Sequence, residues 1–299
     1  MHVALTYFQA VVMGLLQGIT ELFPISSLGH SVLIPALLGW HNLVNSESAT
    51  ESFFLAFIVG LHVGTALGLF VYYRRTWFGL FRGLGRQVGA VRRDGVRSLV
   101  AVSNPSMDPR YRLLLILAVG TIPVGITGVV LEHQLRVLFA KPLAAAIFLT
   151  LNGLVLLAGE RLRRSRGRHV SHLELKTMSP KVALAIGSSQ ILALLAGFSR
   201  AGLTMVAGLL GGLDHEDAAN FSFLLATPVI FLAGALKVPD LLGPLGDGVR
   251  VQTLVGAACA GVAAFVSVRF LTRWFTTRTL TPFGIYCLVA GALCIVRFA

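Results

Sequence analysis

Charged residues are scarce in this chain. They make up 13% of its 299 residues, whereas 55% of the residues are hydrophobic and the mean hydropathy is +0.79. Soluble domains carry roughly 25% charged residues, so this balance excludes an ordinary soluble domain and predicts an integral membrane protein. Because each span takes about 20 residues, the chain has the length of one polytopic unit.

Cysteine is almost absent, and so is any sign of a cleavable targeting segment. The three cysteines, Cys259, Cys287 and Cys294, fall in apolar segments without metal-ligand spacing, and their odd number leaves one out of any disulfide. We interpret them as small packing residues. The first residues lack a basic segment, and the apolar stretch runs directly into polar residues, so we expect no signal peptide.

Basic residues outnumber acidic ones and are unevenly distributed. Of the 25 Lys and Arg residues, nine lie at 72–112, seven at 161–181 and three at 269–278. The positive-inside rule places such segments in the cytoplasm, beside anionic lipid. This distribution explains the net charge of +12 and leaves no reason to expect a nucleic-acid partner.

Apolar segments predict six spans and two shorter hairpins. The spans are expected at 53–72, 112–130, 142–158, 219–237, 251–271 and 283–297, and the three basic segments orient all of them consistently. Arginines alternate with apolar residues at 77–106, which indicates an amphipathic helix on the cytoplasmic leaflet. The stretches at about 3–40 and 182–213 are each broken by a polar turn and fit re-entrant helix-turn-helix hairpins better than pairs of spans.

The two hairpins resemble each other. Residues 26–29 (SSLG) align with residues 199–202 (SRAG) at an offset of 173, and an apolar run and a Phe-rich span follow each. The first hairpin starts outside and the second inside. We therefore predict an all-α polytopic membrane protein with six transmembrane helices and two re-entrant hairpins in inverted-topology repeats. The expected units are repeats at 1–160 and 182–299, joined by a basic cytoplasmic loop at 161–181, with a site near the midplane.

The first hairpin carries candidate acid, base and nucleophile residues. Gln17 and Glu21 share one helix face, and the Glu21 carboxylate can bind a divalent cation or take a proton. The alternative is a helix-end residue that hydrogen-bonds to a neighbouring helix. Ser26 and Ser27 follow the break, where a helix N-terminus makes an anion site, although serines also cap helices. His30 lies on the same face as Ser27 and is a candidate general acid or base.

The second hairpin carries a candidate phosphate clamp. Arg200 is the sole Arg between Lys181 and Lys237, and its guanidinium matches phosphate oxygens in a bidentate manner. Ser199 and Thr204 add hydroxyl donors, and Gly202 allows close backbone approach. The alternative is an Arg that pairs with the carboxylate of the first hairpin purely for structure.

Other polar residues in the apolar segments are less informative. His62 and Thr65 either line a cavity or pack within the protein. The acidic run at 214–217 (DHED) fits the charge pattern of a helix N-terminus.

Four segments resemble the undecaprenyl-diphosphatase family, also known as the bacitracin-resistance protein family: ELFPISSLGH at 21–30, YYRR at 72–75, GFSRAGLT at 197–204 and AANFSFLLATP at 218–228. The resemblance covers most of the chain. It implies a multi-pass enzyme of the bacterial inner (plasma) membrane that hydrolyses undecaprenyl diphosphate to undecaprenyl phosphate. The product is the lipid carrier of cell-envelope synthesis, and the site is expected to open to the extracytoplasmic side.

The resemblance also assigns residues. It implies functional roles for Glu21, Ser27, His30, Ser199, Arg200 and Thr204, and a divalent cation, Mg²⁺ or Ca²⁺. Together with the residue patterns above, we expect catalysis by Glu21, Ser27, His30 and Arg200. We expect substrate binding by Gln17, Ser26, Ser199, Gly202 and Thr204, and cation binding by Glu21. Position 17 is Gln where many members have a second Glu, and Ala196 and Ala201 replace the usual Pro and Ser. The missing carboxylate weakens a two-carboxylate metal site.

The resulting hypothesis is phosphoanhydride hydrolysis where the hairpins meet. Ser27 attacks phosphorus or orients the water that does, and the sequence leaves both routes open. The rival hypothesis is a transporter or flippase of polyprenyl phosphate or another anionic lipid, since inverted repeats and broken helices are also transporter features. A purely structural subunit fits the buried charges poorly. A homodimer is left open.

Overall fold

The computed structural model describes residues 5–40, 43, 53–94, 107–139, 141–165, 175 and 177–299. Within these ranges the chain is all α and has no β-strand. Its α-helices are α1 (Tyr7–Thr20), α2 (Ser27–Leu38), α4 (Phe53–Tyr72), α5 (Arg74–Asp94), α6 (Pro109–Phe139), α7 (Pro142–Ser165), α8 (Pro180–Ser189), α9 (Arg200–Leu210), α10 (His215–Leu242), α11 (Arg250–Trp274) and α12 (Thr281–Phe298). Two short 3₁₀ helices, η2 (Gln190–Leu194) and η3 (Pro244–Gly246), complete the described elements.

Six of these helices correspond to the six predicted spans. Helices α6, α7, α10, α11 and α12 are long and apolar enough to cross a membrane, and α4 joins them when the bent pair of α4 and α5 is counted as one span. The bounds of α4 match the prediction at both ends. The other helices run past the predicted bounds, because a helix continues through charged flanks such as Arg161–Ser165 that an apolar window leaves out. The molecule is an all-α polytopic membrane protein.

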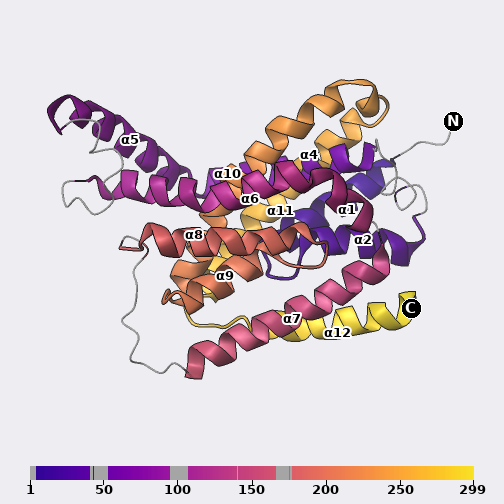
Figure 1. Cartoon of the computed structure of the whole chain (residues 1–299). Coiled ribbons are helices and arrows are strands. Elements are labelled where there is room, and N and C mark those ends of the chain that lie inside the picture. The colour runs from indigo at the N-terminus through magenta and orange to yellow at the C-terminus, as the bar shows by residue number, and fades with distance from the viewer. Residues whose placement is uncertain are drawn as a thin grey trace.

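Helix α5 turns 79° away from α4 and extends from the bundle (Figure 1). Trp77 and Leu80 are buried against the bundle, whereas Phe78, Phe81 and Val88 are exposed. This is the amphipathic helix predicted at 77–106, over residues 74–94; residues 95–106 lie outside the described part of the chain.

The first hairpin consists of two helices too short to span a bilayer. At 1.5 Å per residue, the 14 residues of α1 and the 12 of α2 are about 21 and 18 Å long, against a hydrocarbon core of about 30 Å. Thr6 and Gln9 form a capping box at the start of α1. Gly39, in the left-handed conformation, ends α2.

The second hairpin repeats this construction. Helix α8 has 10 residues and continues into η2, and α9 has 11 residues after the break. Ser179 caps α8 through the backbone N–H of Val182. Half-length helices on both sides of a polar break are what the sequence predicted for 182–213.

The two halves of the chain pack crosswise. Helix α1 packs against α11 and α8 against α6, while α4 packs against both α11 and α10, and α7 against α12; Figure 1 shows α7 and α12 side by side. Backbones approach closely, since an added Cβ at Gly64 would lie 2.1 Å from the carbonyl oxygen of Ala257, and one at Gly187 would lie 2.1 Å from that of Gly120. Inverted repeats predict this exchange of partners, and the division of the chain at 160 and 181 stays a prediction.

The helix ends predicted to be cytoplasmic meet at one end of the bundle. Glu160, near the end of α7, accepts hydrogen bonds of 2.7 Å from His215 Nε2 at the start of α10 and from the N–H of Leu280 before α12. Tyr73 donates to Asn220 Oδ1 at 2.7 Å. Helix α7 runs to Ser165, so the predicted connecting loop begins later than 161; residues 166–174 and 176 lie outside the described chain.

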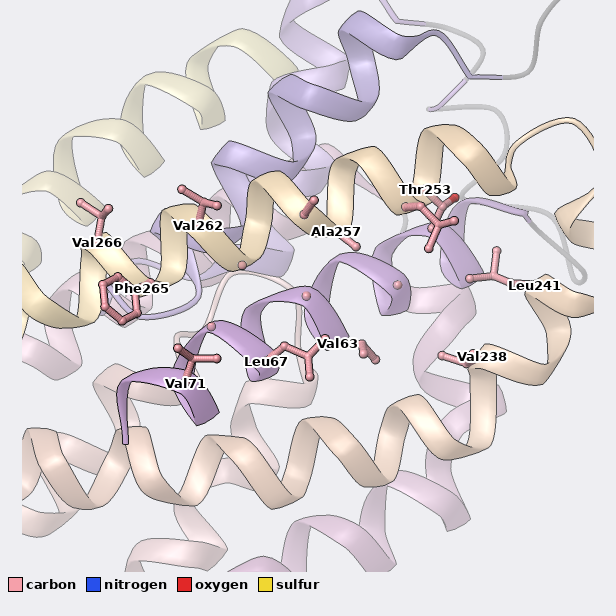
Figure 2. Close-up of a pocket in the computed structure, with 16 residues that line it drawn as sticks. Val63, Leu67, Val71, Val238, Leu241, Thr253, Ala257, Val262, Phe265 and Val266 are labelled. Carbon is pink, nitrogen blue, oxygen red and sulfur yellow. The ribbon is translucent and has the colours of Figure 1, made fainter. Parts of the chain in front are cut away.

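An apolar groove lies among α4, α10 and α11. Figure 2 shows its lining residues on these three helices, among them Val63 and Leu67 of α4, Ala257 and Val262 of α11 and Val238 of α10. The groove has a volume of about 680 Å³, and no titratable side chain lines it. It has no part in the chemistry below.

Candidate active site

The two polar breaks cross in the middle of the molecule. The hydroxyl oxygen of Ser26 accepts hydrogen bonds from the N–H groups of Gly29, at 3.1 Å, and of Gly197, at 3.2 Å. An added Cβ at Gly29 would lie 2.9 Å from the Cα of Gly197. Glycine at both positions therefore brings the start of α2 against the break before α9.

Ser26 holds an unusual backbone conformation. Its φ of +73° makes it the one non-glycine residue with positive φ in the described chain, a conformation that costs energy and is common at functional sites. His30 Nδ1 lies 2.7 Å from the Ser26 carbonyl oxygen. This hydrogen bond helps to hold the turn that starts α2 at Ser27.

Glu21 is the centre of the site. The residue is 7% exposed. Its Oε2 accepts from Gln17 Nε2 at 3.1 Å and from the Ser27 hydroxyl at 2.5 Å, and lies 3.3 Å from His62 Nε2. Its Oε1 faces Arg200. A buried carboxylate is stable only with such partners, so α1, α2, α4 and α9 all converge on it.

Arg200 pairs with Glu21 and keeps spare donors. Its Nε and one terminal nitrogen donate to Glu21 Oε1 at 3.2 and 3.1 Å, and its other terminal nitrogen donates to the Ser222 carbonyl oxygen at 3.2 Å. A guanidinium carries five N–H groups, and these contacts engage three of them. Two N–H groups are left for a ligand, so the pairing with Glu21 also orients a clamp.

Ser27 and Arg200 occupy equivalent places. Each is the first residue of its helix, directly after a capping serine that accepts from an N–H three residues on: Gly29 for Ser26, and Gly202 for Ser199. Helix N-termini carry partial positive charge and attract anions. Two such termini therefore point their first side chains at one carboxylate.

A cavity of about 580 Å³ opens beside this cluster. Glu21, Ser27, His62, Ser199 and Arg200 line its polar end. Its walls come mainly from α4, α6, η2 and α10 and are largely apolar, with Thr121, Gln190 and Lys237 as polar lining residues. Val129 of α6 is 63% exposed, and Leu232 and Leu236 of α10 are 54% and 60% exposed, so the apolar end opens on the molecular surface between these helices.

Several predicted site residues lie behind the cavity wall. Thr204 donates to backbone carbonyls of its own helix, and its hydroxyl contacts that of Ser222 at 2.7 Å. Gln17, Ser26 and Gly202 support Glu21 and the two breaks and do not line the cavity. Of the predicted substrate-binding residues, the structure places Ser199 at the cavity.

The structure separates the two candidate histidines. His30 is not among the cavity-lining residues, and its Nε2 lies 2.8 Å from the Tyr286 hydroxyl, so both ring nitrogens have partners. His62 lines the cavity and contacts Glu21. Sequence reasoning left His62 open because a lone histidine in an apolar span fits packing equally well.

Two buried amides were missed. Asn152 of α7 is fully buried and bonds to both breaks; as a lone Asn in an apolar span it carried a signal. Gln190 lines the cavity and follows Gln17 at the same offset of 173 that relates the serine motifs. Each glutamine has a buried amide oxygen without a partner in the described chain.

A divalent cation finds few ligands here. The described residues contain no group of three or more His, Cys, Asp or Glu side chains that could hold a metal. Among the described residues, Glu21 is the single carboxylate that lines the cavity. Gln17 Oε1 has no partner in the described chain, but Gln17 does not line the cavity. Mg²⁺ commonly binds one or two carboxylates together with substrate phosphates. The donor set thus fits a cation that arrives with a phosphate ligand.

The whole chain matches known proteins. Residues 10–293 match the family described as bacitracin resistance protein BacA. Undecaprenyl-diphosphatase 2 of Frankia alni is 49% identical, with 99% of this chain and 98% of that protein covered. Undecaprenyl-diphosphatase of Mycolicibacterium paratuberculosis is 48% identical, with 99% and 98% covered, and undecaprenyl-diphosphatase 2 of Chromobacterium violaceum is 43% identical, with 95% and 96% covered. The chain therefore belongs to the BacA family of bacitracin resistance proteins.

Proposed function

We propose that this protein hydrolyses undecaprenyl diphosphate to undecaprenyl phosphate and inorganic phosphate, and so recycles the lipid carrier for cell-envelope synthesis. The observation that carries the proposal is Arg200, which Glu21 holds at the cavity with two N–H groups left over. The names of the relatives support hydrolysis over the transporter alternative.

Glu21 and Ser27 supply the base and the attacking group. The Ser27 hydroxyl donates to Glu21 Oε2 at 2.5 Å, so the carboxylate can take its proton as the oxygen attacks the terminal phosphorus. The bond from that phosphorus to the bridging oxygen then breaks, and undecaprenyl phosphate leaves. Water releases phosphate from the serine in a second step. In the alternative route, Ser27 orients a water that attacks directly.

Arg200 offsets the charge that develops on the phosphoryl oxygens. Its spare N–H groups and the N-termini of α2 and α9 are fixed before the substrate arrives, so they need no reorganisation in the transition state. Ser199, which lines the cavity, adds a hydroxyl donor.

His62 is the imidazole placed to move a proton. It lies 3.3 Å from the carboxylate oxygen that accepts from Ser27, and it lines the cavity. His30 instead holds the Ser26 carbonyl, so its role becomes the positioning of the turn before Ser27.

Glu21, together with the substrate's phosphate oxygens, would hold Mg²⁺ or Ca²⁺. The cation would supply Lewis-acid neutralisation of phosphate charge. Removal of divalent cations with EDTA is expected to lower the rate.

The prenyl chain lies in the cleft between α6 and α10. There the cavity is largely apolar, with Lys237 among its lining residues, and opens on the surface among exposed residues such as Val129 and Leu232. A lipid substrate can therefore place its diphosphate at Arg200 while its chain stays in the bilayer.

We place the protein in the bacterial inner membrane with the site open to the extracytoplasmic side. The basic ends of the spans support this orientation. A nucleic-acid partner is not expected, and a homodimer stays a prediction.

Phosphate release from undecaprenyl diphosphate by the purified protein in detergent tests the proposal. We expect release by the wild type, a reduced rate with EDTA, and losses of about 100-fold or more for Ser27→Ala and Arg200→Ala. A wild-type rate no higher than that of both variants would count against hydrolysis. Accumulation of the lipid on one face of proteoliposomes would then favour transport.

A further inference from the structure

Both polar breaks contact helix α7. An added Cβ at Gly197 would lie 2.5 Å from the Ala145 carbonyl oxygen and 2.6 Å from the Phe148 Cβ, and the rings of Phe148 and Phe198 pack 5.6 Å apart. Asn152 lies one turn further along the same face. The second break therefore lies directly on α7.

Asn152 is the side chain that joins the two breaks. It is fully buried. Its Nδ2 donates to the Pro24 carbonyl oxygen at 3.0 Å, and its Oδ1 accepts from the Ser199 N–H at 3.0 Å. These two partners identify the amide nitrogen of Asn152, because a carbonyl oxygen only accepts a hydrogen bond and a backbone N–H only donates one. Cys287 of α12 lies 3.4 Å from the same Nδ2.

The bonded backbone groups belong to residues next to the chemistry. Pro24 precedes the capping Ser26 and the nucleophile Ser27, and Ser199 is the cap directly before Arg200. A change in the distance between Pro24 and Ser199 therefore changes the distance between Ser27 and Arg200.

We propose that Asn152 is a positioning residue that sets the register between the nucleophile hairpin and the phosphate-clamp hairpin by holding the Pro24 carbonyl and the Ser199 N–H. The proposal rests on the proposed hydrolysis. No atom of Asn152 touches the cavity, so it acts through Ser27 and Arg200.

Two variants and one control test this role in the phosphate-release assay. Asn152→Leu keeps the size of the side chain and removes both hydrogen bonds. Asn152→Asp keeps the acceptor, and only its protonated carboxyl also supplies a donor to Pro24. Thr150→Val is the matched control on α7, because the Thr150 hydroxyl donates to the Ala146 carbonyl oxygen within the helix. Folded protein is quantified by size-exclusion profile and thermal unfolding, so that rates refer to folded molecules.

We expect kcat per folded molecule to fall about 100-fold for Asn152→Leu, as for a misplacement of about 1 Å between reacting groups, while Thr150→Val stays at the wild-type value. The activity of Asn152→Asp relative to wild type should rise as the assay pH is lowered. Both proteins contain Glu21 and His62, so the titration of these two groups cancels in the ratio. Cys287 is the titratable side chain that contacts the amide.

Equal kcat for Asn152→Leu and Thr150→Val would overturn the proposal, and so would a low kcat of Asn152→Asp that does not rise as the pH is lowered. If Asn152→Leu fails to fold, the pH dependence of Asn152→Asp decides alone. An inactive wild type would instead count against the proposed hydrolysis.

Discussion

Glu21 binds Arg200 through one carboxylate oxygen and Gln17, Ser27 and His62 through the other. Each partner restricts the carboxylate to one rotamer, so the oxygen that accepts from Ser27 is held in place before a substrate binds. The charge of Arg200 is required for this arrangement, because a buried carboxylate without a cation is strongly disfavoured.

Replacement of Arg200 by Lys should therefore preserve charge but lose function. A lysine has three N–H groups on one nitrogen instead of five on a planar fork, so it cannot replace all the bonds to Glu21, Ser222 and a phosphate. We therefore expect kcat/KM to fall about 100-fold, the cost of one lost transition-state donor. Arg269→Lys, at an exposed position near the end of α11, is the control. Steady-state phosphate release checks the result, and similar rates for both variants would exclude the bidentate clamp.

We predict different effects on the pH profile for substitutions of the two histidines. His62→Gln retains an amide donor to Glu21 but cannot carry a proton, so we expect kcat to fall by about 100-fold or more with a flattened pH profile. His30→Gln retains a donor for the Ser26 carbonyl, and we expect a wild-type pH profile with about 1 kcal/mol lower stability.

The pH dependence of kcat for both variants is the measurement. A profile flattened by the His30 substitution and unchanged by the His62 substitution would return the proton-carrying role to His30.

For individual residues, the sequence predicted which of them lie together in the site but not which role each one has. The hairpin motifs indicated Glu21, Ser27 and Arg200, and the structure brings them together. The side on which His30 points depends on the turn at Ser26 and on Tyr286, 256 residues away. The contacts of Asn152 likewise depend on long-range packing that no local pattern records.

The substrate cleft is a property of two helices, α6 and α10. Gly125 and Gly128 lie on the wall of α6 within the cavity, and an added Cβ at either position would meet nothing within 4 Å. At these two glycines the cleft is therefore bordered by backbone without side chains, and a larger side chain can extend into the cleft without a clash.

Gly128→Leu is expected to fold at least as well as wild type, since Gly is less favourable than other residues in helices by up to about 1 kcal/mol. We expect KM for undecaprenyl diphosphate to rise about tenfold, because displacement of about two methylene groups at roughly 0.8 kcal/mol each corresponds to that factor. A short-chain prenyl diphosphate should be hydrolysed as before. Gly85→Leu on α5, where an added Cβ also meets nothing, is the control.

Kinetics with the long and the short substrate give the answer. A loss of equal size for both substrates would show that the variant disturbs the polar end, and no change for the long substrate would place the chain elsewhere.

The positions of the helices were the most predictable feature of the structure. Apolar length placed the spans, and polar breaks placed the hairpins, because both follow from the cost of an unsatisfied backbone in lipid. The ends were less predictable: α7 continues to Ser165 and α6 to Phe139, since a helix does not stop where hydropathy falls.

At the level of the whole molecule, contacts at one end of the bundle agree with the charge distribution. The contacts of Glu160 with His215 and Leu280 join the end of α7 and the start of α12, which basic flanks assigned to one side, with the start of α10. The distribution of basic residues predicted that the first two of these helix ends lie together. The crosswise packing of α1 on α11 and α8 on α6 could be predicted only from the inverted repeat.

Cysteine labelling tests the orientation. In a background with the native cysteines replaced, Ser165→Cys at the end of α7 should react with a membrane-impermeant reagent only in opened or inverted vesicles. Asp247→Cys, exposed between α10 and α11, should react from outside intact cells. The opposite pattern would invert the topology and place the site on the cytoplasmic side.

The ion pair of Glu21 and Arg200 links residues 179 positions apart, and a ribosome makes them in order. At about 5–20 residues per second, Glu21 emerges roughly 10 to 40 s before Arg200. During that interval His62 is the imidazole that the described first half of the chain places beside Glu21. The first hairpin therefore gains its full partnership only late in synthesis, so entry of Glu21 into the bilayer core should wait for the second hairpin.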